Sequence, residues 1–280
     1  VFVSGALHQM HRYTRERDPN KQAMFKPRPF ERYLEKHAIK GDPGDEDFTN
    51  LIRVFMPEFQ KAFPKAKVYS DWRELLDKEA KNFDTANVST PDHMHAPIAM
   101  SAMQLGKHVY VQKPLTHDVF ESRKLREYAA TNKLVTQMGI QVHSSQVYRE
   151  AVELVHQGAI GKVTEVHTWS SKKWGDTSPR PSRKDKVPTG MDWNAWCGVA
   201  TKNDFINGYY HPGNWRRRLD YGTGTFGDMG CHIYDPMYGA VGLTAPLSVR
   251  SEGLAPVAAS HSWNINAKIH YVFPGTKYTE

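Results

Sequence analysis

Three short strand-type segments separated by helical segments constrain the fold of this chain more than any other feature. The strand-type segments are residues 85–89, 108–111 and 134–138, and helices are predicted between them over about 95–105 and 116–132. Strands and helices that alternate at about 25-residue spacing are typical of right-handed parallel βαβ units. We therefore predict a Rossmann-type parallel sheet in this part of the chain.

The ends of these predicted elements carry local signals. Ser70 is a plausible N-cap for a short helix that starts at Asp71, and Thr116 is a plausible N-cap for the helix that follows it. Gly106 is a typical residue just beyond a helix C-terminus. Ligands of parallel sheets bind beyond the carboxyl ends of the strands. This rule directs attention to residues 90–93 and to 112–114, and also to 139–141.

The pattern changes in the second part of the chain. Residues 163–171 form a longer β-type stretch, and further strand-like segments occur at 247–252 and 267–273. We place a domain boundary near residue 145. The prediction is thus an α/β plus α+β protein, in which a Rossmann-like domain over 1–145 precedes a substrate-binding domain with an open, mainly antiparallel sheet over 146–280.

Composition and charge exclude several classes of protein. The hydrophobic content of 39% is that of a globular protein, and no apolar run approaches the roughly 20 residues that would span a bilayer. The net charge is +7, but the basic residues are dispersed and no nucleic-acid-binding signature accompanies them. We therefore expect neither nucleic acid nor membrane as a partner. The two cysteines make no disulfide framework, and the N-terminus does not have the pattern of a signal peptide.

Lys113 is the first candidate for chemistry. It precedes Pro114 directly after the second predicted strand, where an ammonium group would project into the ligand crevice. There it could donate to a substrate hydroxyl and favour the alkoxide as hydride leaves. A surface lysine at the start of a loop is the alternative, and position alone does not decide between them.

Asp228 and His232 form the second candidate group. They are four residues apart in a glycine-rich segment, so a helix would place them on one face. A carboxylate beside an imidazole can orient a general base. The alternative is an ion pair on a helix surface. A metal site that adds His211 is a weaker reading, because no third ligand occurs at a recognisable spacing.

Histidines and aromatic residues elsewhere allow two further readings. His93 and His95 suggest contacts with a ligand or a helix cap rather than a metal site. The aromatic residues could form a wall on which a sugar stacks, although ordinary core packing explains any one of them as well. They are Trp169, Trp174, Trp193, Trp196, Tyr209, Tyr210 and Trp215.

Four segments in the same order and spacing resemble the glucose-fructose oxidoreductase, inositol dehydrogenase and rhizopine-catabolism (Gfo/Idh/MocA) family. They are 89–95, 106–115, 158–163 and 222–232. The resemblance covers about 65–245, and 193–232 looks like a bacterial subgroup of larger members, several of them exported. It implies a cofactor, NAD or NADP, and hydride transfer to or from a secondary hydroxyl of a sugar, polyol or glycoside.

The resemblance also assigns roles to individual residues. Lys113, Asp228 and His232 match the catalytic residues of the family. The positions expected to line the cofactor are Ser89, Thr90, Pro91, His93, His95, Gln112, Lys113 and Gln141. We assign substrate contacts to Tyr210, His211, Trp215 and Arg216, and we assign no metal ligand.

This sequence departs from the family pattern in three ways. Gln112 replaces the glutamate that usually precedes the lysine. The family's Gly-x-Gly-x-x-Gly turn, which grips the pyrophosphate, is not found before the first predicted strands. Because Gly5–Leu7 matches a strand that follows this turn in the family, the resemblance places the first βα unit before residue 1. Gln9 or His11 stands where an acidic residue would grip the ribose. The closing sheet of the family also extends beyond Glu280. We expect a chain truncated at both ends that binds NAD(H) weakly.

Three functions fit these observations. The first is a sugar or polyol dehydrogenase. The second is an enzyme that cleaves or epimerises a glycoside through transient oxidation and retains its NAD, and the third is a non-catalytic sugar-binding relative. We expect a small-molecule carbohydrate as partner and a homodimer or homotetramer formed through the open sheet face. The expected compartment is the cytoplasm, or the periplasm if an export signal precedes residue 1.

Overall fold

The computed structural model describes residues 61, 63–211, 213–253 and 257–280. Its first half contains a three-stranded parallel sheet in the order β1-β2-β3. The strands are β1 (Thr85–Val88), β2 (His108–Gln112) and β3 (Thr136–Gly139). The register pairs Val88 with Val111 and Val111 with Met138. The predicted parallel sheet is therefore confirmed.

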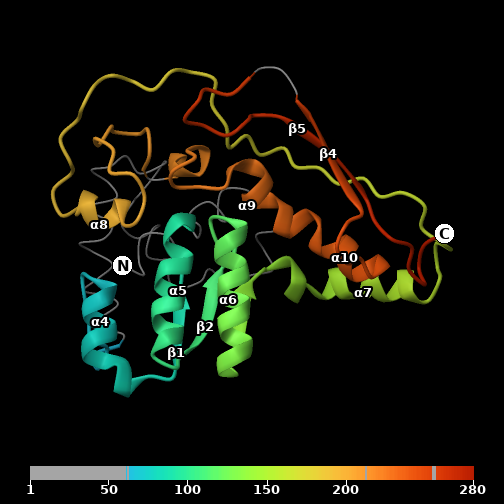
Figure 1. The fold of residues 1–280 in the computed structure, drawn as a ribbon, viewed down its shortest axis with the longest axis horizontal. Coiled ribbons are helices and arrows are strands. Elements are labelled where there is room, and N and C mark those ends of the chain that lie inside the picture. Colours follow the sequence, from blue (N-terminus) through green and yellow to red (C-terminus); the bar gives the residue numbers. More distant parts are fainter. Residues whose placement is uncertain (1–60, 62, 212, 254–256) are drawn as a thin grey trace.

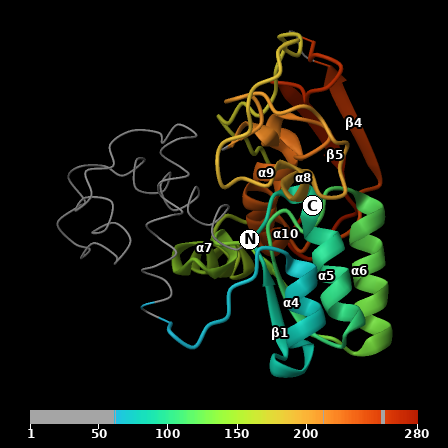
Figure 2. The same cartoon turned by 90° about the vertical axis from the view of Figure 1, so that its left-hand side faces the viewer.

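Helices α5 and α6 lie side by side against this sheet (Figures 1 and 2). The elements around them are α4 (Trp72–Glu79), η2 (Ala80–Asn82), η3 (Asp92–Met94), α5 (His95–Gln104) and α6 (Val119–Asn132). Apolar side chains from both layers form the core, and Val88, Val111 and Met103 are each at most 2% exposed. Small residues of α5 such as Ala99 and Ala102 have no exposed surface, so helix and sheet pack closely.

The helix caps differ in detail from the sequence prediction. Asp71, not Ser70, caps α4 and accepts a hydrogen bond from the Arg73 amide. Asp118, not Thr116, caps α6 and forms a reciprocal capping box with Glu121. A carboxylate next to the first turn accepts hydrogen bonds from the free amides, and its negative charge interacts favourably with the positive end of the helix dipole. Gly106 has φ +74° after α5, as predicted for a residue that ends a helix.

The second half combines helices with a two-stranded antiparallel sheet. Its elements are η4 (Val142–Ser144), α7 (Gln146–His156), α8 (Trp193–Cys197), η5 (Asn214–Arg217), α9 (Gly224–Ile233), α10 (Asp235–Val241), β4 (Ser248–Gly253) and β5 (Ala267–Val272). Helix α7 lies along α10, and β4 and β5 form the long ribbon beyond them (Figure 1). The strands predicted at 247–252 and 267–273 are therefore confirmed, as is the fold class.

The strand predicted at 163–171 is wrong. This segment runs as extended chain and makes a single parallel bridge, from Val163 to Thr279. A strand requires a neighbouring strand with which its backbone exchanges hydrogen bonds. A β-type sequence pattern alone does not provide that neighbour. The expected strand at 5–7 lies outside the described residues.

An aromatic cluster forms a second core over residues 187–221. Its buried members are Trp193, Cys197, Phe205, Ile206, Tyr209, Tyr210, Trp215 and Tyr221. Trp193 stacks on Trp196 with ring centroids 4.6 Å apart. This cluster gives a long region with little regular secondary structure a fixed shape. Among the described residues, no helix is long and apolar enough to cross a membrane.

Candidate active site

A buried ion pair joins the two halves of the molecule. Lys113 follows β2, and its Nζ lies 2.5 Å from Oδ1 of Asp228 on α9 and 3.0 Å from the Asp228 carbonyl oxygen. Both residues are 7% exposed. The strand end and the helix face that the sequence singled out separately therefore meet.

Two further side chains hold the Asp228 carboxylate. Trp174 donates its indole N–H to Oδ2 at 2.7 Å, and Arg216 places Nε 3.5 Å from Oδ1. Burial acts to raise the pKa of Asp228, but the charges of Arg216 and Lys113 and the hydrogen bonds outweigh burial and lower it. Asp228 is therefore a buried, ionised carboxylate with two cationic neighbours.

His232 lies one helical turn beyond Asp228, on the same face of α9. Burial and then the charge of Lys113 lower the pKa of this imidazole, although Asp228 opposes them. Among the described residues, the hydrogen bonds to the Asp228 carboxylate come from Lys113 and Trp174, and His232 donates none. Asp228 therefore acts on the His232 imidazole through its charge and not through a hydrogen bond. Its hydrogen bond joins it to Lys113, so Asp228 chiefly positions Lys113.

The predicted cofactor residues His93 and His95 direct their ring nitrogens to backbone carbonyls. His95 is fully buried, and its nitrogens lie 2.7 Å from the carbonyl oxygens of Thr90 and Pro114. It thereby ties the end of β1 to the end of β2. His93 reaches the carbonyls of Tyr221 and Trp196, at 3.3 and 3.1 Å, and so connects the first half to the second.

A carboxylate that the sequence analysis missed fixes the start of α9. Oδ2 of Asp92 accepts hydrogen bonds from the amide and the hydroxyl of Thr223, at 3.2 and 2.8 Å. Residues 222–227 read Gly-Thr-Gly-Thr-Phe-Gly, a literal match to the dinucleotide-binding pattern. A dinucleotide-binding turn directly follows a strand, whereas this match follows the 3-10 helix η5 and its amide at Thr223 is bound by Asp92. The match therefore lacks the structural context of a cofactor turn.

The strand ends offer groups suited to a dinucleotide. Thr90 Oγ1, at the end of β1, is sealed from solvent and makes no hydrogen bond with a described residue. Gln112 accepts a hydrogen bond from the Lys113 amide, and Ser89 donates to Asn87. Pro91 and Gln141 also lie at these strand ends, after β1 and β3 respectively. The described residues contain no group of three or more side chains that could hold a metal ion.

The residues assigned to the substrate differ in their surroundings. Tyr210 and Trp215 belong to the aromatic core, at 2% and 5% exposure, and their contact with a substrate stays a prediction. His211 is also buried, at 5% exposure, and its ring is edge-on to Trp196. Arg216 reaches the Asp228 carboxylate directly.

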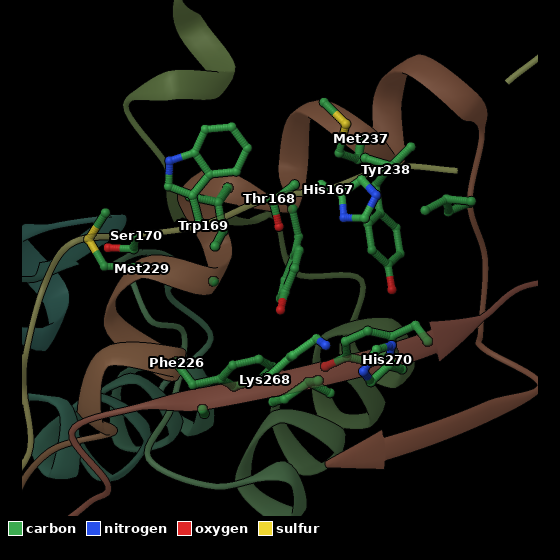
Figure 3. Close-up of a pocket in the computed structure, with 18 of the residues that line it drawn as sticks. His167, Thr168, Trp169, Ser170, Phe226, Met229, Met237, Tyr238, Lys268 and His270 are labelled. Atoms are coloured by element: carbon green, nitrogen blue, oxygen red, sulfur yellow. The ribbon is translucent and has the colours of Figure 1, made fainter. Parts of the chain in front are cut away.

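A large trough of about 1330 Å³ lies on another face of α9 (Figure 3). The extended segment 163–173 and α10 lie across it from β5. Phe226 and Met229 of α9 also line it, but Lys113, Asp228 and His232 do not. The trough and the buried ion pair are therefore separate features.

Comparison with known families agrees with this architecture. The model of the oxidoreductase family with an NAD-binding Rossmann fold matches residues 35–140, and the model of the C-terminal alpha/beta domain of the same family matches residues 149–275. The chain belongs to the Gfo/Idh/MocA oxidoreductase family. Its first half is thus a family domain of the NAD-binding type.

Relatives of this Gfo/Idh/MocA chain are distant. Levoglucosan dehydrogenase of Pseudarthrobacter phenanthrenivorans is 22% identical over 166 residues, which are 59% of this chain and 34% of that protein. A glycosyl hydrolase family 109 protein of Shewanella is 32% identical over 104 residues, which are 36% of this chain and 22% of that protein. The chain thus spans about a third or less of the length of these two relatives.

A solved oxidoreductase from Sinorhizobium meliloti has the same fold. The match has a TM-score of 0.50 at 21% identity and covers 76% of this chain and 47% of that one. At this identity the likeness concerns the fold alone.

Proposed function

We propose that this protein transfers hydride between a nicotinamide cofactor, NAD or NADP, and a secondary hydroxyl of a sugar, polyol or glycoside. The observation that supports the proposal most is the Lys113–Asp228 ion pair, which places an ammonium group at the strand end where parallel sheets bind ligands. A half-buried imidazole, His232, lies one helical turn away on the same face.

Each of the three residues then has a separate task. The ammonium of Lys113 donates to the reacting oxygen and stabilises its developing negative charge. His232, whose lowered pKa favours the neutral imidazole, accepts the hydroxyl proton. Asp228 fixes the direction of the Lys113 side chain. Strand-end residues such as Thr90, Gln112 and Gln141 would hold the nicotinamide cofactor, which would supply the hydride acceptor.

Steady-state kinetics on a panel of sugars and polyols with NAD and NADP test these roles. His232→Ala should lower turnover by about 10²–10⁴-fold with a smaller effect on KM, because a general base acts in the transition state. Lys113→Ala should change both constants, since the ammonium contacts the bound hydroxyl as well as the alkoxide. Asp228→Asn should be milder than His232→Ala.

Exposed residues supply matched controls. His167→Ala and Lys124→Ala remove the same side-chain types far from the ion pair, and both should leave the kinetics unchanged. Normal turnover in His232→Ala together with inactive Asp228→Asn would reverse the assigned roles. If all three variants kept normal turnover, the ion pair would be structural and the proposal would fail.

A second candidate is glycoside cleavage or epimerisation through transient oxidation with retained NAD. The similarity to a glycosyl hydrolase family 109 protein supports it. The two functions differ in their cofactor balance. A dehydrogenase accumulates one NADH for each substrate oxidised, whereas transient oxidation releases product without net NADH. Absorbance of NADH and analysis of the sugar products in the same reaction therefore distinguish them.

A further inference from the structure

Arg216 is an unusual feature of the buried ion-pair group. Its guanidinium lies over the ring of Trp215, 4.2 Å from the centroid, and 5.7 Å from the centroid of Trp174. The side chain is about one-tenth exposed. Two indole rings thus hold a planar cation in a fixed orientation beside the Asp228 carboxylate.

The guanidinium keeps most of its donors unused. Among the described residues, its side chain makes the 3.5 Å ion pair from Nε to Asp228, and neither Nη atom hydrogen-bonds to any of them. The sealed side-chain atoms without a partner belong to Thr90, Tyr209, Arg217 and His261, so the Nη atoms of Arg216 face a space that solvent reaches. These donors are therefore free to bind an anionic group that enters from solvent.

The nearby carboxylates do not supply these acceptors. Asp228 already accepts hydrogen bonds from Lys113 on Oδ1 and from Trp174 on Oδ2. Asp92, whose charge also reaches Arg216, is bound to Thr223, and burial raises its pKa. Lys113 and Arg216 therefore share the Asp228 carboxylate, so the side chains in direct contact comprise two cations and one anion.

We propose that Arg216 binds a carboxylate on the substrate, so that the protein acts on a sugar acid, such as a uronate, in preference to the neutral sugar. The planar fork of a guanidinium matches the two oxygens of a carboxylate, and an ammonium does not reproduce this geometry. This inference rests on the proposed function, because it concerns the substrate of the same site.

Calorimetric titration with matched pairs tests it directly. The pairs are glucuronate against glucose and galacturonate against galactose. The unmodified protein should bind at least one acid about 10-fold or more tightly than its neutral partner. Arg216→Met should reduce this ratio to about 1, and Arg216→Lys should leave an intermediate ratio because it keeps the charge without the fork.

Controls separate this inference from the proposed function. Arg250→Met removes the same charge at an exposed position on β4 and should leave the ratio unchanged. If the protein binds the acid more tightly but forms NADH from no substrate, the carboxylate site is upheld and the dehydrogenase function is contradicted. Two results would overturn the carboxylate site alone. One is turnover of neutral sugars while no acid binds more tightly than its neutral partner. The other is an acid-to-neutral affinity ratio that stays the same in both Arg216→Lys and Arg216→Met.

Discussion

At the scale of single residues, Asp228 receives contacts from three separate parts of the chain. The family resemblance implied Lys113, Asp228 and His232 as a catalytic group, and helical spacing placed the last two on one face. It did not predict that Trp174 would donate to Asp228, because the two are 54 positions apart and no local pattern fixes the direction of an indole N–H. It also proposed cofactor contacts for His93, whose nitrogens the structure directs to carbonyl groups.

Replacement of Trp174 by phenylalanine tests its contact with Asp228. Trp174→Phe keeps an aromatic ring but removes the 2.7 Å hydrogen bond to Oδ2. A bond to a charged group contributes about 1.5–3 kcal/mol, so the free energy of unfolding should fall by that amount. Turnover should fall roughly 10-fold, because the Asp228 carboxylate that positions Lys113 is then held less firmly. Urea unfolding and steady-state kinetics measure the two effects.

Trp193→Phe is the matched control for this substitution. It removes an indole hydrogen bond of the same length, but to the neutral carbonyl of Asn203. It should cost about 0.5–1.5 kcal/mol of stability. If Trp174→Phe lowers turnover no more than Trp193→Phe does, Trp174 has only a packing role.

At the scale of elements, the start of α9 decides the geometry of the site. Residues 221–223 are held by Asp92, by His93 and by His117, whose Nε2 lies 3.2 Å from the Gly222 carbonyl oxygen. The sequence predicted α9 and the three parallel strands because local spacing defines them. It failed at 163–171, where the outcome depends on a distant partner, and it displaced two helix caps by one or two residues.

Gly222 provides a test of this rigid helix start. A Cβ at this position would lie 2.5 Å from the Arg216 Cα and 2.8 Å from the Trp215 carbonyl oxygen. Because both are backbone atoms, Gly222→Ala should displace the Arg216 segment and cost more than about 2 kcal/mol. Thermal and urea unfolding would measure the loss.

Gly230→Ala is the comparison within the same helix. Its Cβ would meet only the Tyr234 ring, at an ordinary 3.5 Å, so the higher helix propensity of alanine should leave stability unchanged or raise it by up to about 1 kcal/mol. Equal stability of the two variants would contradict a rigid contact at Gly222.

At the scale of the whole molecule, buried polar groups connect the Rossmann-type half to the second half. The ion pair of Lys113 with Asp228 and the hydrogen bonds of Asp92 and His93 all cross this junction. The order of the two sheet types was predictable from the sequence, whereas these cross-connections depend on tertiary contacts. The boundary near residue 145 and the homo-oligomer stay predictions.

The junction should make stability sensitive to acid through His93. Burial lowers the pKa of His93 to about 4 from an ordinary value of 6.5. Below pH 6.5 the unfolded chain binds a proton at His93 that the folded chain does not bind, so stability is lost as the pH falls from 6.5 towards 4. Between pH 7 and 5 the loss from this group should be roughly 2 kcal/mol.

Urea unfolding of the unmodified protein and of His93→Gln at both pH values measures this contribution. The variant should lose roughly 2 kcal/mol less than the unmodified protein on acidification, whatever its stability at pH 7. His156→Gln removes an exposed imidazole that also contacts a carbonyl, that of Gly239, and should keep the full acid dependence. An unchanged acid dependence in His93→Gln would show that the His93 imidazole is not buried at this junction.

The pair of indoles beside Arg216 has a practical consequence. Trp174 and Trp215 are both nearly buried and both lie within 6 Å of the guanidinium, so the local electric field acts on their excited states. A negatively charged group arriving at Arg216 would change that field and shift the emission of these two tryptophans. The molecule therefore carries its own fluorescent reporter of occupancy, one that needs no label and no turnover.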